Sequence, residues 1–207
     1  MTFDPRWDAV HRERQWATNP CEHLCRFVAT NYPGERAGLR ALDLGCGAGA
    51  QTFFMASRRF RVAGIDGSAA AIDRCADRGW ERSFPKQRED LPTFEVADMT
   101  SLPFPHNEFD LAVDVASLQC LDHADAVKAM AEVHRVLKPG GRLFSYTSRV
   151  GTSLAVHRNM PVRSMARQEV HALYGKHFDV RTVDTDTHTR DNGALVVSHW
   201  IIVARKA

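Results

Sequence analysis

Residues 42–50 read LDLGCGAGA, and this stretch decides the fold. An apolar run that ends in closely spaced glycines and leads into a helix is typical of a buried strand followed by a turn that holds a ligand against backbone amides. Gly45, Gly47 and Ala50 also satisfy the spacing of the dinucleotide fingerprint. Because small residues also serve simple turns, this spacing predicts a ligand-binding loop without identifying the ligand.

Outward from this loop, apolar segments alternate with helical segments. We expect strands at residues 41–44, 61–65, 93–96, 109–113, 142–147, 178–183 and 194–204. We expect helices in the first 38 residues and at residues 50–58, 69–78, 124–137 and 165–176, with a helix stop at 138–141. We expect a surface loop at residues 79–92, a loop or lid at 148–163 and a hairpin loop at 184–193. Strands that alternate with helices predict a doubly wound α/β fold with a mostly parallel sheet. Since no helix separates the last two strands, the final strand is expected to run antiparallel at or near an edge.

The first 38 residues lie outside this alternation and divide the chain in two. We expect a helical cap of residues 1–38 over the carboxyl ends of the strands, where doubly wound folds bind ligands. Residues 39–207 then form the sheet domain. From the cap, His11, Arg14 and Trp16 are candidates to close the site, with Trp16 equally suited to packing.

The composition excludes several classes of protein. The 207 residues are 44% hydrophobic and 25% charged, as in a globular domain, and the net charge of +2 gives no case for a nucleic-acid partner. No run approaches the roughly 20 apolar residues that span a bilayer, and no signal peptide is visible, so a cytoplasmic location is expected. The five cysteines are odd in number and scattered, which favours neither a disulfide framework nor a metal site.

Three acidic residues stand at the ends of three successive strands. Asp43 would repel a pyrophosphate on the glycine loop and favour a ligand that carries a cation. Asp66 can accept hydrogen bonds from both hydroxyls of a ribose. Asp98 can accept from an adenine amino group while Met99 packs on the ring. S-adenosylmethionine has an ammonium, a sulfonium, a ribose and an adenine but no phosphate, so these acids predict a site for it.

Six segments resemble the successive motifs of class I S-adenosylmethionine-dependent methyltransferases, close to the small-molecule branch of the ubiquinone-biosynthesis type. These segments are residues 42–49, 64–68, 96–99, 102–104, 109–114 and 134–141. The resemblance implies a Rossmann-like sheet of seven strands in the order 3-2-1-4-5-7-6, with strand seven antiparallel. Residues 14–17, Pro20 and residues 199–203 also resemble a bacterial subgroup that often accompanies polysaccharide or modified-sugar biosynthesis.

The resemblance also implies which residues hold the cofactor and its product, S-adenosylhomocysteine. It assigns the glycine loop to the methionine moiety, the segment after the second strand to the ribose, and the segment after the third strand to the adenine. The residues after the fourth strand line the cofactor beneath the methyl group, although Asp114 departs from the smaller or uncharged residue of many relatives. The expected cofactor-binding set is Trp16, Asp43, Gly45, Cys46, Gly47, Asp66, Gly67, Ser68, Asp98, Met99, Asp114 and Val115.

Methyl transfer needs a general base only when the acceptor must lose a proton early, as a hydroxyl does. His123 is the first candidate, oriented by Asp122 or Asp125, and its alternative role is to cap or pack the following helix. Tyr146 is the next candidate and, with His157 and Arg158, is expected to bind the substrate; solvated loop positions are the alternative for the last two. Cys46 is not expected to act as a nucleophile.

The sequence therefore predicts an enzyme that methylates O or N of a small-molecule or sugar-like acceptor. The alternatives are an NAD(P)-dependent oxidoreductase, which Asp43 and residues 138–141 disfavour, and a non-catalytic S-adenosylmethionine-binding module. A nucleic-acid methyltransferase is disfavoured because residues 114–117 read DVAS in place of an Asn/Asp-Pro-Pro-aromatic tetrad. The oligomeric state stays open.

Overall fold

The computed structural model describes residues 4–13, 19–77, 91–152, 160 and 162–207. Its centre is one seven-stranded sheet in the order β3-β2-β1-β4-β5-β7-β6. The strands are β1 (Arg40–Leu44), β2 (Arg61–Asp66), β3 (Thr93–Val96), β4 (Phe109–Val115), β5 (Leu137–Ser148), β6 (Asp179–Arg190) and β7 (Leu195–Arg205). Only β7 runs antiparallel to its neighbours, β5 and β6. The predicted doubly wound fold and strand order are confirmed.

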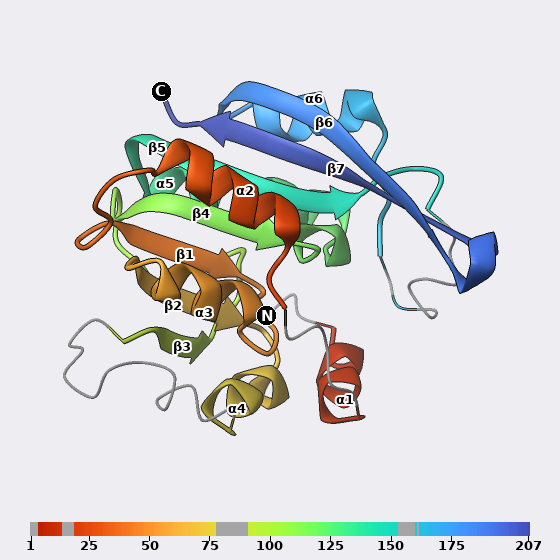
Figure 1. The fold of residues 1–207 in the computed structure, drawn as a ribbon, viewed down its shortest axis with the longest axis horizontal. Helices are drawn as coiled ribbons and strands as arrows, with labels where there is room; N and C mark the ends of the chain where they lie inside the picture. The colour runs from red at the N-terminus through yellow and green to blue at the C-terminus, as the bar shows by residue number, and fades with distance from the viewer. Residues whose placement is uncertain (1–3, 14–18, 78–90, 153–159, 161) are drawn as a thin grey trace.

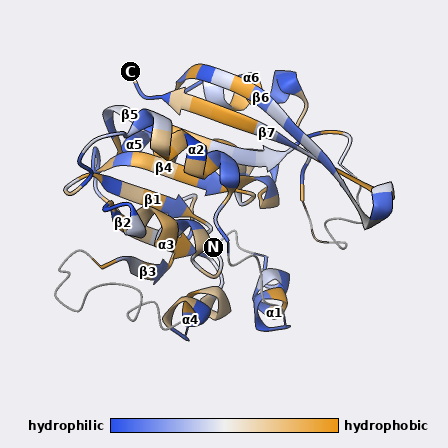
Figure 2. Cartoon of the chain, viewed as in Figure 1, coloured by the Kyte–Doolittle hydropathy of each residue, from blue (hydrophilic) through white to orange (hydrophobic). Residues whose placement is uncertain are grey.

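Helices cover both faces of this sheet (Figure 1). The helices are α1 (Arg6–Glu13), α2 (Glu22–Asn31), α3 (Ala50–Ser57), α4 (Ala69–Asp77), α5 (His123–Val136) and α6 (Arg167–Gly175), with short 3-10 turns η2 (Leu118–Cys120) and η4 (Asp191–Gly193). One apolar layer joins α2 and α3 to the sheet, and the other joins α5 and α6 to it. Figure 2 shows the hydrophobic strands at the centre of the fold. None of the described helices is long and apolar enough to cross a membrane.

The pairing register brings several strand ends to one edge. Leu44 at the end of β1 lies opposite Ile65 of β2 and Asp114 of β4. Val115, one residue further, lies opposite Tyr146 of β5. Because these strands are parallel, their carboxyl ends and the loops that follow them meet at this edge. This edge is where doubly wound sheets bind ligands.

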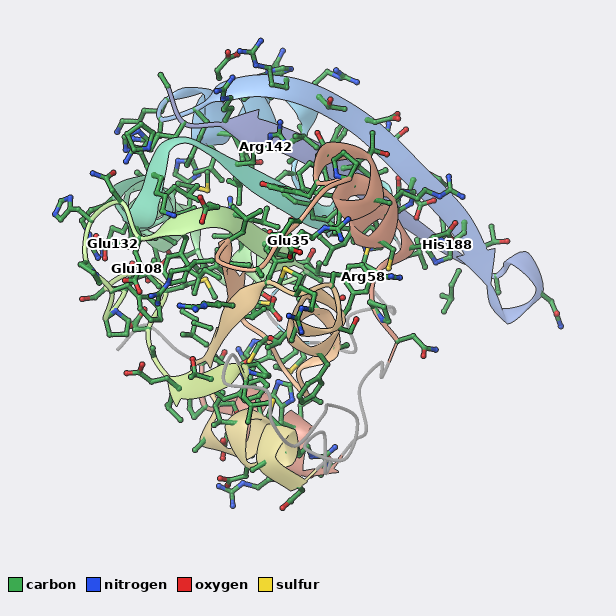
Figure 3. The ribbon with its side chains drawn as sticks, turned by 60° about the vertical axis from the view of Figure 1, so that its left-hand side comes forward. Glu35, Arg58, Glu108, Glu132, Arg142 and His188 are labelled. Carbon is green, nitrogen blue, oxygen red and sulfur yellow. The ribbon has the colours of Figure 1, made fainter. Side chains whose placement is uncertain are left out.

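The two N-terminal helices occupy different places. Helix α1 lies beside α4 near the carboxyl edge (Figure 1). Helix α2 lies across the sheet and buries Leu24, Phe27 and Val28 among residues of β4, β5 and α3. Arg142 of β5, labelled in Figure 3, donates to the carbonyl of Asn31 at 2.9 Å and so fixes the end of α2. Helix α2 thus belongs to the helical layer of the sheet, and the cap of residues 1–38 stays a prediction.

Two segments differ from the sequence prediction. Residues 184–193, expected to be a loop, continue β6 to Arg190 and form a long hairpin with β7. Threonines alternate there with acidic residues and a histidine, a period-two pattern that suits a strand. Residues 138–141, expected only to stop a helix, form the start of β5, because Leu137 pairs with Phe109 and a register shift accommodates the glycines that follow.

Candidate active site

The glycine loop is fastened to the end of β2. The backbone N–H of Gly47 donates to Asp66 Oδ2 at 2.9 Å, and the N–H of Ser68 donates to Asp66 Oδ1 at 2.9 Å. Gly47 has a φ of +54°, which a glycine adopts without strain. The Asp66 side chain is buried, which raises its pKa, while the amide of Ser68, the imidazole of His11 and the amide of Gly47 oppose the rise. Asp66 therefore joins two of the loops expected to hold the cofactor.

The turn after β4 closes on the same loop. Ser117 Oγ donates to the carbonyl of Gly45 at 3.0 Å. A Cβ added to Gly45 would lie 2.4 Å from Ser117 Oγ and 3.7 Å from the terminal carbon of Met99. Gly45 is thus required both by its φ of +63° and by this close approach. Met99 and Gly45, predicted to contact the cofactor, do lie together.

Asp114 holds this turn from beneath. Its carboxylate is fully buried and accepts from the N–H groups of Ser117 and Leu118, each at 2.9 Å, and from Ser145 Oγ at 2.5 Å. Burial raises the pKa of Asp114, and these three hydrogen bonds oppose the rise. The Asp114 side chain thus positions the turn after β4. Val115, the other residue predicted here to line the cofactor, is the last residue of β4 at the carboxyl edge of the sheet.

Asp43 lies under the glycine loop. Its carboxylate is 1% exposed and accepts from Thr52 Oγ1 of α3 at 2.6 Å. Burial raises the pKa of Asp43 to about 7, hydrogen bonds from Thr52 oppose the rise, and the nearby Asp66 and Asp114 add to it. A cationic ligand at this edge would lower that pKa and be attracted by the ionised form.

Helix α1 approaches the loop from outside. His11 is buried, and its Cε1 lies 3.6 Å from where a Cβ on Gly47 would be. Asp8 Oδ1 accepts from Ser68 Oγ at 2.7 Å and from the N–H of Ala70 at 3.0 Å, so it caps the start of α4. His11 therefore lies against the glycine loop, and its role in closing the site stays a prediction.

The remaining cofactor candidates follow β3 and the glycine loop. Asp98 Oδ1 accepts from the N–H of Thr100 at 2.9 Å and from its Oγ1 at 2.7 Å. Cys46 is buried, and contact with the Cys75 thiol together with burial raises its pKa, which keeps it protonated. A protonated thiol is a poor nucleophile, and the prediction that Cys46 takes no such role stays a prediction. Trp16 lies outside the described residues.

The predicted general base His123 lies at the start of α5. Its side chain is 64% exposed, and its Nδ1 lies 3.8 Å from Glu169 of α6. Asp122 accepts from the N–H of Asp125 at 2.8 Å and caps the helix, while Asp125 bonds Lys128. The described contacts therefore give His123 a partner in Glu169, and they give Asp122 and Asp125 other roles.

Tyr146 lies at the carboxyl edge of the sheet on the α2 side. Its hydroxyl donates to Asp186 Oδ2 of β6 at 2.7 Å. Its ring stacks on His199 of β7, with 4.2 Å between ring centres, and on His23 of α2, with 5.6 Å. The other two predicted substrate residues, His157 and Arg158, lie outside the described residues.

Several residues of this edge were not predicted from the sequence. Asp8, His23, Ser117 and Asp186 are the main ones. The alternating threonines of residues 185–189 are the signal that would have placed Asp186 on a strand. Ser117 is the last residue of the DVAS segment, residues 114–117, at the end of β4. For Asp8 and His23 no local pattern exists, because their partners lie far away in the chain.

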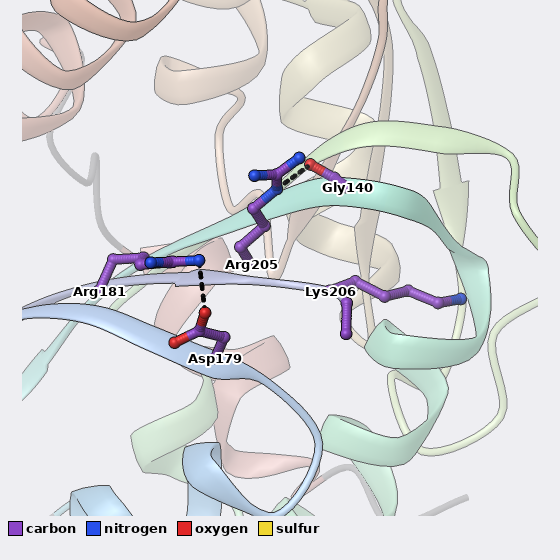
Figure 4. A pocket seen from close by; sticks show the side chains of 6 residues that line it. Gly140, Asp179, Arg181, Arg205 and Lys206 are labelled. Carbon is purple, nitrogen blue, oxygen red and sulfur yellow. Dashed lines mark hydrogen bonds and ion pairs between the residues drawn. The ribbon is translucent and has the colours of Figure 1, made fainter.

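A pocket of about 210 Å³ lies at the opposite end of the sheet (Figure 4). It is lined by Gly140, Asp179, Arg181, Arg205, Lys206 and Ala207. Arg181 pairs with Asp179, and Arg205 donates to the carbonyl of Gly140. The charged groups of Arg181 and Arg205 thus already have partners in the pocket wall. Because this pocket lies far from the glycine loop, we do not assign the chemistry to it. Within the described ranges, no group of three or more His, Cys, Asp or Glu is placed to hold a metal ion.

A comparison with protein families identifies the family of the chain. Residues 42–145, half of the chain, match the methyltransferase domain family. The chain belongs to this family. The predicted resemblance to class I S-adenosylmethionine-dependent methyltransferases is thereby confirmed, and with it S-adenosylmethionine as the cofactor of the family.

Two curated relatives match this methyltransferase domain. One is 27-O-demethylrifamycin SV methyltransferase of Amycolatopsis mediterranei, 38% identical over 110 residues that are 52% of this chain and 38% of that protein. The other is the ubiquinone/menaquinone biosynthesis C-methyltransferase UbiE of Brucella abortus, 34% identical over 121 residues, 56% of this chain and 42% of that protein. The chain thus spans about two fifths of the length of these relatives. Neither gives support to the polysaccharide or sugar subgroup.

A solved structure extends the likeness over nearly the whole methyltransferase chain. The N-methyltransferase NodS of Bradyrhizobium japonicum, in complex with S-adenosylhomocysteine, superposes with a TM-score of 0.72. The alignment covers 98% of this chain and 99% of that one at 20% sequence identity. At that identity the likeness shows the shared fold.

Proposed function

We propose that this chain transfers a methyl group from S-adenosylmethionine to a small-molecule acceptor. The observation that carries the proposal is the bond between Asp66 and Gly47, which unites the glycine loop with an acid at the end of β2. Such an acid suits ribose hydroxyls, and a Cβ at Gly45 of the loop would overlap the Ser117 side chain. The proposed cofactor residues are those named above at the carboxyl edge.

The residues present fit the cofactor by charge. Asp43, Asp66 and Asp114 lie near one another at this edge, close enough that their charges interact. A phosphate-bearing ligand would be repelled there, which disfavours an NAD(P)-dependent oxidoreductase. The bound cofactor supplies an electrophilic methyl group on a sulfonium. The chain's own residues orient it, exclude water and aim the acceptor, and positioning alone provides up to roughly 7–11 kcal/mol in the best-oriented systems.

The acceptor side lies next to Val115, at the residues around Tyr146. The proposed acceptor atom is an oxygen or a nitrogen of a small molecule, which includes sugar-like molecules. The similar proteins do not favour one acceptor atom, because one is named a C-methyltransferase and another an N-methyltransferase. A non-catalytic S-adenosylmethionine-binding module is the second candidate, and the intact glycine loop supports it equally.

Calorimetry and a transfer assay test the proposal together. We expect S-adenosylhomocysteine to bind in the micromolar range and NAD(H) not to bind. Tritium from labelled S-adenosylmethionine should then pass to a member of a screen of sugar nucleotides, lipid precursors and small metabolites. Binding of NAD(H) in place of S-adenosylhomocysteine would refute the assignment. Binding without transfer to any acceptor would favour the non-catalytic module.

A further inference from the structure

The carboxylate of Asp186, near the proposed place of the acceptor, lies close to three groups that carry protons. Besides the Tyr146 hydroxyl, Asp186 Oδ2 lies 3.4 Å from His23 Nε2 and 3.7 Å from His188 Nδ1. His188 belongs to β6, in the long hairpin with β7 (Figure 3). Burial raises the pKa of Asp186, but Tyr146, His23 and His188 outweigh it, and the net effect lowers the pKa. Asp186 is therefore ionised at neutral pH.

This cluster is fixed next to the cofactor loop from two sides. The N–H of Ala116, in the turn after β4, donates to the carbonyl of Tyr146 at 2.8 Å. The N–H of Cys21 donates to Gln51 Oε1 at 2.9 Å, which ties the start of α2 to the first turn of α3. The glycine loop leads directly into that turn of α3, and His23 lies two residues after Cys21. His23 is therefore held at the same edge as the glycine loop.

The pair of His23 and Asp186 has the chemistry of an oriented base. His23 Nε2 lies within ion-pair distance of Asp186 Oδ2, and an imidazole that keeps its proton on the nitrogen facing a carboxylate carries its lone pair on the other nitrogen, here Nδ1, where it can take a proton. The carboxylate also stabilises the imidazolium that results. The side chains of His23 and Asp186 are 28% and 27% exposed, so a ligand can reach them.

We propose that His23 is the general base of this enzyme and that the acceptor is a hydroxyl. The inference rests on the proposed function and deepens it. The hydroxyl oxygen attacks the methyl carbon, the carbon–sulfur bond breaks, and its electron pair stays on sulfur, which leaves a neutral thioether. The hydroxyl proton passes to His23 Nδ1 and then to water. Asp186 is a positioning residue, since it acts through His23.

The competing histidines are less well placed. His188 is farther from the carboxylate than His23 and is 40% exposed. His123 is 64% exposed and lies beside Glu169, on the opposite side of the sheet from α2. His199 is buried beneath the Tyr146 ring and helps to fix it. Of the histidines that the structure describes, His23 alone combines a carboxylate partner, an anchored helix and a place beside the Tyr146 ring.

Ionisation of a bound phenol tests the proposal without turnover. We use para-nitrophenol as the probe, with S-adenosylhomocysteine present, and record the phenolate absorption. Wild-type protein should raise the phenolate fraction of bound probe above that in solution at the same pH. His23→Gln should abolish the rise, and His106→Gln, an exposed histidine of the opposite sheet edge, should keep it. Absence of the rise in wild type, or an equal rise in His23→Gln, overturns the proposal.

Turnover with the acceptor from the screen gives a second readout. His23→Gln should lower kcat about 100- to 10,000-fold and remove the acidic limb of the pH profile. The groups that face His23 are Tyr146, Asp186 and, through Tyr146, His199; Cys21 lies two residues before it. Because Asp186 is the charged group among them, Asp186→Asn should shift that limb. Loss of the limb in His123→Gln but not in His23→Gln contradicts the proposal. Unchanged S-adenosylhomocysteine affinity in His23→Gln separates failure of this inference from failure of the proposed function.

Discussion

Asp66 at the end of β2 accepts a hydrogen bond from the backbone of Gly47, so the strand that is expected to bind the ribose also sets the shape of the loop expected to bind the methionine moiety. The same carboxylate accepts from Ser68 and starts the turn into α4. One side chain therefore organises two halves of the site before any ligand arrives. Pre-organisation of this kind lowers the cost of ordering on binding.

Asp66→Ala should weaken binding of S-adenosylhomocysteine about 10- to 150-fold, the equivalent of roughly 1.5–3 kcal/mol for hydrogen bonds to a charged group. The loss combines missing bonds to the ribose with a glycine loop that is no longer held. Isothermal titration calorimetry measures it. Asp73→Ala, an exposed acid on α4, is the matched control and should leave the affinity unchanged. An unaltered dissociation constant in Asp66→Ala would remove Asp66 from the site.

Gly45→Ala should destabilise the chain and abolish cofactor binding. The new Cβ would meet Ser117 Oγ at 2.4 Å, in addition to the strain of a positive φ, which costs roughly 1–2 kcal/mol. Gly38→Ala supplies the control, because Gly38 also has a positive φ but nothing lies within 4 Å of its added Cβ. Thermal unfolding should show a larger fall in Tm for Gly45→Ala. An equal fall in Tm for the two variants would mean that the contact with Ser117 does not contribute to the destabilisation.

Asp43→Asn should stabilise the ligand-free chain above about pH 7. The pKa of Asp43 is raised by burial to about 7, whereas an unfolded Asp titrates near 3.9. Between these values the folded chain holds a proton that the unfolded chain has lost, so the free energy of unfolding falls as pH rises and the cost is complete above about 7.

The gain in Tm for Asp43→Asn at about pH 8 should be at least roughly 2–4 °C, the effect of about 1 kcal/mol in a chain of this size, and should shrink towards pH 4. The same variant should bind S-adenosylmethionine more weakly, because the anionic partner of its positive charges is gone. A Tm gain that does not depend on pH would contradict this account of Asp43.

Asp8→Ala should release α1 from α4. The amide of Ala70, the hydroxyl of Ser68 and the guanidinium of Arg12 hold the pKa of Asp8 at about 2, so the residue caps α4 as an anion at neutral pH. Without it, the Ala70 amide should exchange its hydrogen faster, as measured by hydrogen–deuterium exchange. Asp4→Ala changes the acid that caps α1 itself and should leave exchange at Ala70 unaltered. Equal exchange in both variants would show that Asp8 does not hold the helix.

The doubly wound class was predictable because short apolar runs alternate with helical segments over most of the chain, whereas the strand order came from the resemblance to the methyltransferase family. The hairpin of the last two strands was predicted, but the length of β6 was not, because residues 184–190 include no apolar residue and only the alternation of Thr185, Thr187 and Thr189 signals a strand there. Within the site, the residues predicted near the glycine loop follow strands at regular spacing, and their binding of the cofactor stays a prediction. The contacts between Asp8 and Ser68 and between His23 and Asp186 depend on how α1 and α2 dock, which no local pattern encodes.

Strand β6 is one of the two edge strands of the sheet, and it is long. The unpaired backbone of such an edge is a template on which a foreign strand can add, and proteins prevent this with charged side chains. Asp179, Arg181, Asp184 and Asp186 are spaced along β6, so a second chain that added there would bring its backbone against a row of charges. The carboxylate that holds Tyr146 therefore also helps to keep the sheet from growing into an aggregate.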